Sequence, residues 1–295
     1  MTTPAAESPP DGTAPAAPTH PAHSADAAGD ADDAVTLAAI AIVAFILADV
    51  AHEVIGHGAA WVALGGRSAV MTTTRLIVDV RRLTDASGRV FSVGGPLGNL
   101  VFAGLAWLAQ RLPRSLSART RAFLWLSLAF NLLWAVGYLI YSGVLGSGDW
   151  AELVRGVGPA WLWRTVLVAL GAALYLRSVR ALARELRWFL GAGAGDAAHR
   201  AWRLVAIAYL AAGIVACAGA WPDPRGASQV LLSAVPVTVL GNAPLLMTPR
   251  LLARLPPLPA VAPAPIARSF AWIAAAALAA AIYAGALGPG MPVAW

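Results

Sequence analysis

The sequence predicts an all-α polytopic membrane protein of about seven transmembrane helices, with a small β-hairpin between the first and the second. Two features of the composition predict this class. Of the 295 residues, 59% are hydrophobic and 12% are charged, whereas charged residues make up about 25% of an ordinary soluble protein. The apolar residues also gather in runs close to the ~20 residues that a helix needs to cross a bilayer. A soluble domain is therefore excluded.

Seven apolar runs are long enough, or nearly long enough, to span the membrane. Polar or Pro-rich connectors separate them, and tryptophans cluster near their ends, as is typical of the membrane–water interface. The sixth run contains Pro236 and Pro244, so we expect a kinked helix there. The runs are residues 35–65, 95–112, 120–146, 159–182, 201–221, 230–252 and 269–287.

The segment between the first two runs reads as a β-hairpin. Residues 69–80, "AVMTTTRLIVDV", are rich in β-branched side chains, "TDASG" is a turn signal, and "RVFSV" at 89–93 follows. Open strand edges are not tolerated against lipid. We therefore expect the hairpin at the interface or inside a cavity lined by protein.

Charge and composition change at the N-terminal end of the chain. Residues 1–33 are rich in Pro and Ala, contain six acidic residues and have no Lys or Arg. This composition predicts a disordered acidic tail, and it lacks the positive n-region and early apolar core of a secretory signal. The folded part is expected to begin at residue 34.

Arginine supplies all the positive charge of the chain, whose net charge is +6. The arginines flank the apolar runs, which suits anionic lipid headgroups, and no basic–aromatic motif for nucleic acid is present. Connectors after the even-numbered runs together hold more arginine, so the positive-inside rule places the N-terminus in the cytoplasm. We expect a multi-pass bacterial cell-membrane protein that contacts the lipid bilayer and no nucleic acid. The single Cys217 excludes a Cys-based zinc site.

The first run carries an unusual group of ionisable residues. The stretch "ADVAHEVIGHGAAW", residues 48–61, holds Asp49, His52, Glu53 and His57. Ionisable residues inside membrane helices are costly and usually functional. A buried polar cluster that pairs with arginine or with the backbone is the structural alternative.

The histidine spacing is one residue longer than in the zinc motif H-E-x-x-H. Five residues correspond to about 140° on an ideal helix, so the two rings would point apart. A π-bulge removes this obstacle by inserting one residue into a turn. We therefore predict a π-bulge or kink near residues 54–56, at Gly56, that brings His52 and His57 onto one face.

A catalytic zinc site needs a third protein ligand and an open position for water. Asp149 in "GSGDWAEL" is the best candidate, because it follows the third run and so reaches the same side of the membrane as the two histidines. The alternative is an N-cap at the start of "DWAELVRGV". Asp49, one turn before His52, is expected to orient a histidine ring from outside the ligand set.

At this point the chain resembles the site-2 protease family of intramembrane zinc metalloproteases. "HEVIGHG" lies in a transmembrane run, "GGPLGNL" at 94–100 is similar to the family's G-P-x-x-N segment, and "FNLLWAVGYLIYSGVLGSGDW" at 130–150 supplies an Asn and a later Asp. The pattern H-E-x-x-G-H also resembles the zinc motif of dipeptidyl-peptidase III enzymes. The family resemblance implies a Zn²⁺ cofactor bound by His52, His57 and Asp149, with Glu53 activating water.

The resemblance also implies a domain organisation and a substrate class. Residues 34–152 would form a metallopeptidase-like core and residues 153–295 would be accessory helices. The substrate would be a membrane protein or peptide, held in extended form against an edge of the hairpin. Asn99 and Asn131 would donate hydrogen bonds to the substrate backbone or the oxyanion, or would serve polar packing between helices.

Two other functions fit the same residues. Asp49, His52, Glu53 and His57 could line a cation or proton pathway in a transporter or channel, for which a broken sixth helix would be suitable. A non-catalytic relative could also keep the fold and act as a membrane scaffold.

Overall fold

The computed structural model describes residue 2 and residues 32–112, 116–190, 194–256 and 265–295. Within them, seven helices are long and apolar enough to cross a membrane, which confirms the predicted fold class. The predicted tail, residues 1–33, lies outside the described residues except for positions 2, 32 and 33. The seven helices are Ala34–Ala63, Asp85–Ala109, Ala118–Leu145, Ala160–Arg187, Ala197–Ala220, Ala227–Leu252 and Phe270–Leu287.

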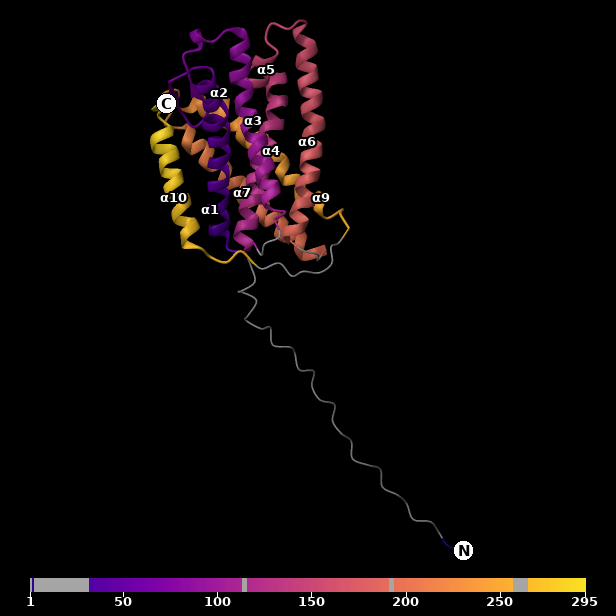
Figure 1. The fold of residues 1–295 in the computed structure, drawn as a ribbon. Helices are drawn as coiled ribbons and strands as arrows, with labels where there is room; N and C mark the ends of the chain where they lie inside the picture. Colours follow the sequence, from indigo (N-terminus) through magenta and orange to yellow (C-terminus); the bar gives the residue numbers. More distant parts are fainter. Residues whose placement is uncertain (1, 3–31, 113–115, 191–193, 257–264) are drawn as a thin grey trace. The chain divides into compact units, whose positions relative to one another are not determined.

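The first membrane helix is the centre of the unit formed by residues 32–295. It consists of α1 (Ala34–Val50), the π-helical η2 (Ala51–His57) and α2 (Gly58–Ala63) in direct succession. Asp33 caps its start by accepting a hydrogen bond from the Thr36 backbone N–H at 2.8 Å. The helix packs against α4 (Ala118–Leu145), α7 (Ala194–Ala220) and α10 (Phe270–Ile282), and Figure 1 shows α10 alongside α1.

The stretch expected to form the first strand, residues 69–80, contains both strands of the observed hairpin apart from Ser68. β1 (Ser68–Met71) pairs antiparallel with the short β2 (Leu76–Ile77), with Val70 opposite Ile77. The other edge of β1 is taken by β3 (Met291–Ala294), which arrives from the far end of the chain and gives the order β2-β1-β3.

The prediction of a strand at 89–93 is wrong, because these residues belong to the helix α3 (Asp85–Ala109). Thr84 and Ser87 form a capping box, and Asp85 lies in the first turn, where the partial positive charge of a helix favours a carboxylate. "TDASG" is therefore the start of a helix and not the turn of a hairpin. "GGPLGNL" consequently lies inside α3, not at its beginning.

The remaining helices surround this centre. α4 packs between α3 and α6 (Ala160–Leu190), and Figure 1 shows α6 running alongside α4. α5 (Asp149–Leu153) is a short helix after α4. The sixth span is broken, as predicted from its prolines, into α8 (Ala227–Gln229), η4 (Val230–Leu240), η5 (Ala243–Met247) and α9 (Thr248–Leu252). The chain then passes through α10 and η6 (Tyr283–Leu287) to β3. The remaining element, η3 (Val80–Arg82), is a single 3-10 turn between β2 and α3.

Candidate metal centre

The two histidines of the first helix lie on one face, because the helix widens between them. The predicted π-bulge near 54–56 is confirmed: Ala51–His57 form π-helical turns within an otherwise α-helical span. The imidazole rings of His52 and His57 are 4.9 Å apart, centre to centre, with their planes at 84°. Both side chains are buried. One additional residue per turn thus offsets the additional residue in the motif.

Asp149 completes the group from the other side of the fold. Its carboxylate Oδ2 lies 3.1 Å from His52 Nε2 and 3.4 Å from His57 Nε2. The chain reaches this position through Gly146, which ends α4 with a φ of +67°, and Gly148, whose φ is +87°. Gly148 is the N-cap of α5 and no side chain caps this helix, so the N-cap alternative for Asp149 does not hold.

The partners of the two rings decide which nitrogens face the centre. His57 Nδ1 lies 2.8 Å from the backbone carbonyl of Phe91, which can only accept a hydrogen bond. His52 Nδ1 lies 2.7 Å from Asn99 Oδ1, an acceptor as well, because the amide nitrogen of Asn99 donates to the carbonyl of Ala48 and to Asn131. Each Nδ1 therefore carries the hydrogen, and each Nε2 presents a lone pair to the centre.

Two lone pairs and a carboxylate oxygen that converge in a buried space need a shared cation or proton. Burial alone raises the pKa of the Asp149 carboxyl, whereas the positive charge and the hydrogen bonds that His57 and His52 supply when they are protonated lower it to about 2. The three ligand atoms all lie within 4.8 Å of one another. Ligands at about 2.0–2.1 Å from a tetrahedral ion are about 3.3 Å apart, which matches the two separations to Asp149. His52, His57 and Asp149 can therefore hold a metal ion.

The helix α3 packs closely against this centre, and the contact requires glycine at Gly95 of α3 and at Gly56 of η2. A Cβ on Gly95 of α3 would lie 2.4 Å from His57 Nε2 and 2.6 Å from His52 Nε2. One on Gly56 would lie 2.5 Å from the carbonyl oxygen of Gly94. Any side chain at these positions would displace the ligand nitrogens or separate the two helices.

Glu53 follows His52 and lies beside the same centre. Its side chain is buried, and its Oε2 has no hydrogen-bond partner among the described residues. A cavity of about 30 Å³, lined by His52, Glu53, Thr73, Tyr138 and other residues, adjoins it. About 10–15 Å³ is enough for one water molecule. Glu53 is thus a buried carboxylate next to a space of the size of water.

The prediction that Asp49 orients a histidine ring is wrong. The Nδ1 atoms of both rings are bound elsewhere, to Asn99 and to the Phe91 carbonyl. Asp49 is buried and interacts with Tyr283 and with the charge of Glu53, while its Oδ1 has no hydrogen-bond partner among the described residues.

The two asparagines form a chain behind His52. Asn99 holds the ring of His52 and donates to Asn131 Oδ1 at 2.9 Å, and Asn131 donates to the Ser127 carbonyl at 2.8 Å. Both amide groups are therefore committed to protein partners. This places them behind His52, and both donors of the Asn99 amide nitrogen are used by protein oxygens.

Aromatic rings of α4 cover the opposite side of His52. Trp134 stacks on His52, with ring centres 5.5 Å apart, and also on Phe45. Tyr138 meets His52 edge-on at 5.9 Å, lines the water-sized cavity, and lies close enough to Asp149 and Glu53 to interact with their charges. The hydroxyl of Tyr138 makes no hydrogen bond with another described residue.

The turn between β1 and β2 closes the cavity from outside. Thr73 and Thr74 line the cavity beside Glu53. Thr73 Oγ1 donates to the Gly219 carbonyl at 3.1 Å, and Tyr283 donates to the Thr73 carbonyl at 3.1 Å.

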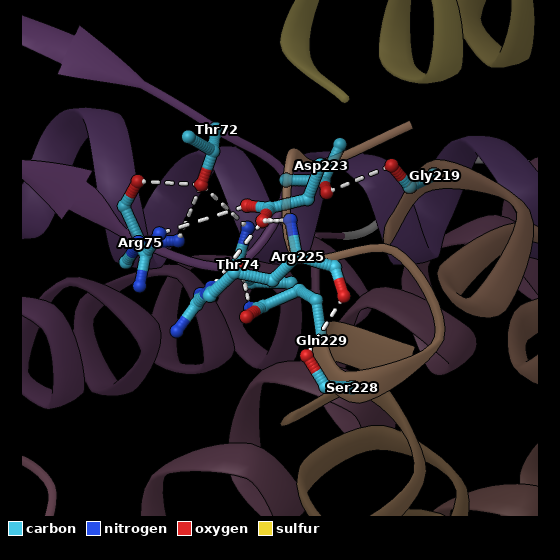
Figure 2. Close-up of polar contacts among 9 residues, drawn as sticks. Thr72, Thr74, Arg75, Gly219, Asp223, Arg225, Ser228 and Gln229 are labelled. Carbon is cyan, nitrogen blue, oxygen red and sulfur yellow. Dashed lines mark hydrogen bonds and ion pairs between the residues drawn. The ribbon is translucent and has the colours of Figure 1, made fainter. Parts of the chain in front are cut away.

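Contacts with the segment after α7 hold the same turn, as Figure 2 shows. Gln229 donates to Thr74 Oγ1. Arg75 lies 3.6 Å from Asp223 Oδ2, and Asp223 also receives hydrogen bonds from the backbone and side chain of Arg225. The turn is therefore attached at both ends to a segment about 150 positions later in the chain.

A larger cleft of about 520 Å³ opens on the other side of the centre. It lies between residues 80–92 and residues 148–156, and it reaches Phe91 and Asp149. Arginines and carboxylates of both regions line it, and the side chain of Asp149 remains 15% exposed. The cleft therefore leads to the partly exposed carboxylate of the centre.

Sequence reasoning missed three contributors to the centre. The Phe91 carbonyl gives no signal in a sequence, because any residue can supply a carbonyl group. Gly95 was within "GGPLGNL", but its role depends on the approach of two helices. Tyr138 lies seven positions after Asn131, on the same face of a helix, and that spacing was the available signal.

In comparisons with known proteins, no family model, no curated protein and no solved structure matches this chain.

Proposed function

We propose that this protein is a membrane-embedded zinc metallopeptidase, with His52, His57 and Asp149 as zinc ligands and Glu53 as the general base. One observation carries the proposal: two histidine Nε2 atoms and a carboxylate converge beside a buried glutamate with an unpartnered oxygen and a water-sized cavity. Two histidines and one carboxylate are an established ligand set of catalytic zinc in peptidases, and the fourth position is then open to water.

Bound Zn²⁺ would lower the pKa of a coordinated water to about 7 and polarise a carbonyl oxygen. The chain's own residues perform the other tasks. Asn99 and the Phe91 carbonyl hold the histidine rings with Nε2 inward. Glu53 accepts the proton of the attacking water and passes it to the leaving amine.

Tyr138 is the group that we assign to stabilisation of the oxyanion. Asn99 and Asn131 were the expected donors, but their amide nitrogens donate to protein oxygens. Tyr138 lines the cavity with His52 and Glu53, and its hydroxyl has no hydrogen-bond partner among the described residues. A hydroxyl donor beside the developing negative charge lowers the barrier of acyl transfer.

The substrate that we propose is an extended segment of a membrane protein or peptide. A helical carbonyl is already hydrogen-bonded, so a transmembrane substrate must unwind before it is attacked. The surface cleft that reaches Asp149 suits an extended segment. Both edges of β1 are occupied, so β-augmentation would use the outer edge of β2 (Leu76–Ile77) or of β3 (Met291–Ala294).

These features support a relation to the site-2 protease family, which we keep as a proposal. The supporting residues are "HEVIGHG" in the first membrane helix, the α3 segment that packs on it, and Asp149 after the third membrane helix.

The test is proteolysis in membranes that contain wild-type protein, Glu53→Gln or Tyr138→Phe. New peptide termini are identified by mass spectrometry, and the zinc content of each purified variant is measured. We expect wild type to generate termini that Glu53→Gln does not, with equal zinc in both. Tyr138→Phe should reduce the cleavage rate about 100-fold or more, as loss of an oxyanion donor does.

The other functions correspond to distinct outcomes. Metal-dependent ion flux in proteoliposomes without new termini would replace the peptidase by a transporter. Protein that binds no metal and produces no termini would indicate a scaffold. Equal termini from wild type and Glu53→Gln would contradict the assignment of Glu53.

A further inference from the structure

A groove between α3, α4 and α6 is lined by none of the three candidate metal ligands. The groove has a volume of about 650 Å³, within the range of about 300–1,000 Å³ typical of small-molecule sites. Its walls are mostly aliphatic and belong to three membrane-spanning helices. They include Leu100 of α3, Leu132 and Leu139 of α4, and Leu170 and Leu174 of α6.

One end of the groove is cationic. Arg177, Arg180 and Arg184 line it, and all three side chains are exposed. They project from one face of α6, at positions i, i+3 and i+7, over about 10 Å of helix. The apolar groove therefore has three positive charges at one end.

These three arginines differ from their neighbours in having no partner. None of them makes an ion pair or hydrogen bond with another described residue. Nearby, Arg111 forms an ion pair with Glu185 at 2.6 Å, and Arg187 donates to the Pro256 carbonyl at 2.9 Å. Arginines within a transmembrane helix are costly unless they are paired or reach the headgroup region.

We propose that this groove binds an anionic phospholipid, with an acyl chain against the leucines and the phosphate against Arg177, Arg180 and Arg184. The charge is complementary, the groove runs along membrane helices, and the arginines lie in the C-terminal half of the span Ala160–Arg187. Basic pockets between transmembrane helices are typical sites for acidic lipid headgroups. This proposal rests on the groove and its arginines alone, and it holds whether or not the protein binds zinc or cleaves peptides.

The experiment is native mass spectrometry of the purified full chain in neutral detergent, with dioleoylphosphatidylglycerol or dioleoylphosphatidylcholine added. We expect wild type to retain the glycerol lipid at least about tenfold better than the choline lipid. The triple variant Arg177→Gln, Arg180→Gln, Arg184→Gln should lose this preference, at about fivefold per arginine. The corresponding triple Lys variant should keep most of it.

Two controls identify the ligand and exclude a general charge effect. The triple variant Arg67→Gln, Arg81→Gln, Arg254→Gln removes three exposed arginines outside the groove and should bind as wild type does. Millimolar inorganic phosphate should not displace the lipid; displacement would show a site for free anions and overturn the proposal. No preference between the two lipids in wild type, or equal loss in the control triple, would also overturn it.

Discussion

Gly95 shows at the level of one residue how closely the candidate metal centre is built. The ligand nitrogens of both histidines occupy the space that a side chain at this position would need. The same helix contains Gly104, around which a Cβ would meet nothing within 4 Å. An alanine at Gly95 therefore tests the candidate metal centre, and an alanine at Gly104 is the matched control for the effect of the substitution on α3 itself.

Gly95→Ala should abolish stoichiometric zinc binding while the protein remains folded. The added Cβ displaces both Nε2 atoms, so we expect zinc affinity to fall by at least about 100-fold, the upper range for loss of an outer partner of a ligand. Chelator competition measures the affinity. Gly104→Ala should bind zinc as wild type does, and alanine there favours the helix by up to about 1 kcal/mol. Normal zinc affinity in Gly95→Ala would contradict the geometry.

Asn99→Ala removes the hydrogen bond that holds His52 but keeps all three ligands. We expect zinc affinity to decrease about 10–100-fold, because the ring loses its fixed tautomer and orientation. Asn242 is a suitable control, since it is equally buried and its amide donates only to the Thr238 carbonyl. Equal effects of Asn99→Ala and Asn242→Ala on zinc affinity would show a general loss of stability instead.

The three residues that could hold a metal ion could be predicted from sequence because few residues qualified. Two histidines lay in one membrane run, and chain direction brought Asp149 to the same end. The partners of the rings could not be predicted in the same way. The roles expected for Asp49 and Asn99 differ from those observed because hydrogen-bond partners depend on how α3 crosses η2, which no local pattern specifies.

At the scale of elements, the error at residues 89–93 has a local cause. Val90, Phe91 and Val93 favour a strand by propensity, but the capping box at Thr84 starts a helix before them. Tertiary contact then favours the helix, since its glycines pack on η2. The strand β3 was not predicted either, because its partner β1 lies more than 200 positions earlier in the chain and no turn joins them.

The turn between β1 and β2, residues 72–75, depends on Asp223 for its attachment. Asp223→Asn removes the charge that pairs with Arg75 and leaves two arginines facing each other. We expect amide hydrogen exchange in this turn to become up to about fivefold faster, because an ion pair with a partly exposed arginine contributes up to about 1 kcal/mol. Zinc content should not change. Hydrogen exchange with mass spectrometry measures the effect.

Asp79→Asn is the control for this change, since the side chain of Asp79 is 53% exposed, forms an ion pair with the exposed Arg82 and accepts a hydrogen bond from the Arg81 backbone N–H. It should leave exchange in the turn as in wild type. Unchanged exchange in Asp223→Asn would show that the threonine contacts alone fix the turn.

At the scale of the whole molecule, Asp32 joins three distant parts of the chain. Its carboxylate accepts two hydrogen bonds from Arg200, at 2.7 and 2.8 Å, and one from the Ile266 backbone N–H at 2.8 Å. The start of α1 is thereby attached to α7 and to the segment before α10. The sequence predicted the number of helices from apolar runs, but it placed Asp32 in the tail, because a distant arginine cannot be recognised from local composition.

Asp32 also predicts a pH dependence of stability. Burial raises the pKa of its carboxyl. The contacts with Arg200 and the Ile266 N–H lower this pKa by more than burial raises it, so it lies below the ordinary value of 3.8. The stabilisation is therefore complete above about pH 3.8 and is lost as the pH falls through the lower pKa of the folded state. Asp32→Asn should lower the thermal midpoint at pH 6 and flatten its fall below pH 4.

The measurement is thermal unfolding in detergent between pH 3 and pH 6, with Asp79→Asn as the exposed control. The control should follow the wild-type curve. If Asp32→Asn also followed it, the contacts of Asp32 would contribute nothing to the assembly of the helices.

The most direct test of the account is the metal content of the purified protein under non-chelating conditions, measured by inductively coupled plasma mass spectrometry. Wild type should contain about one Zn²⁺ per chain, as a site with three protein ligands holds. His52→Ala, His57→Ala and Asp149→Ala should each lose it, while Glu53→Gln keeps it. Wild-type protein that is folded but holds no stoichiometric metal, or an Asp149→Ala variant that holds as much as wild type, would contradict the central claim.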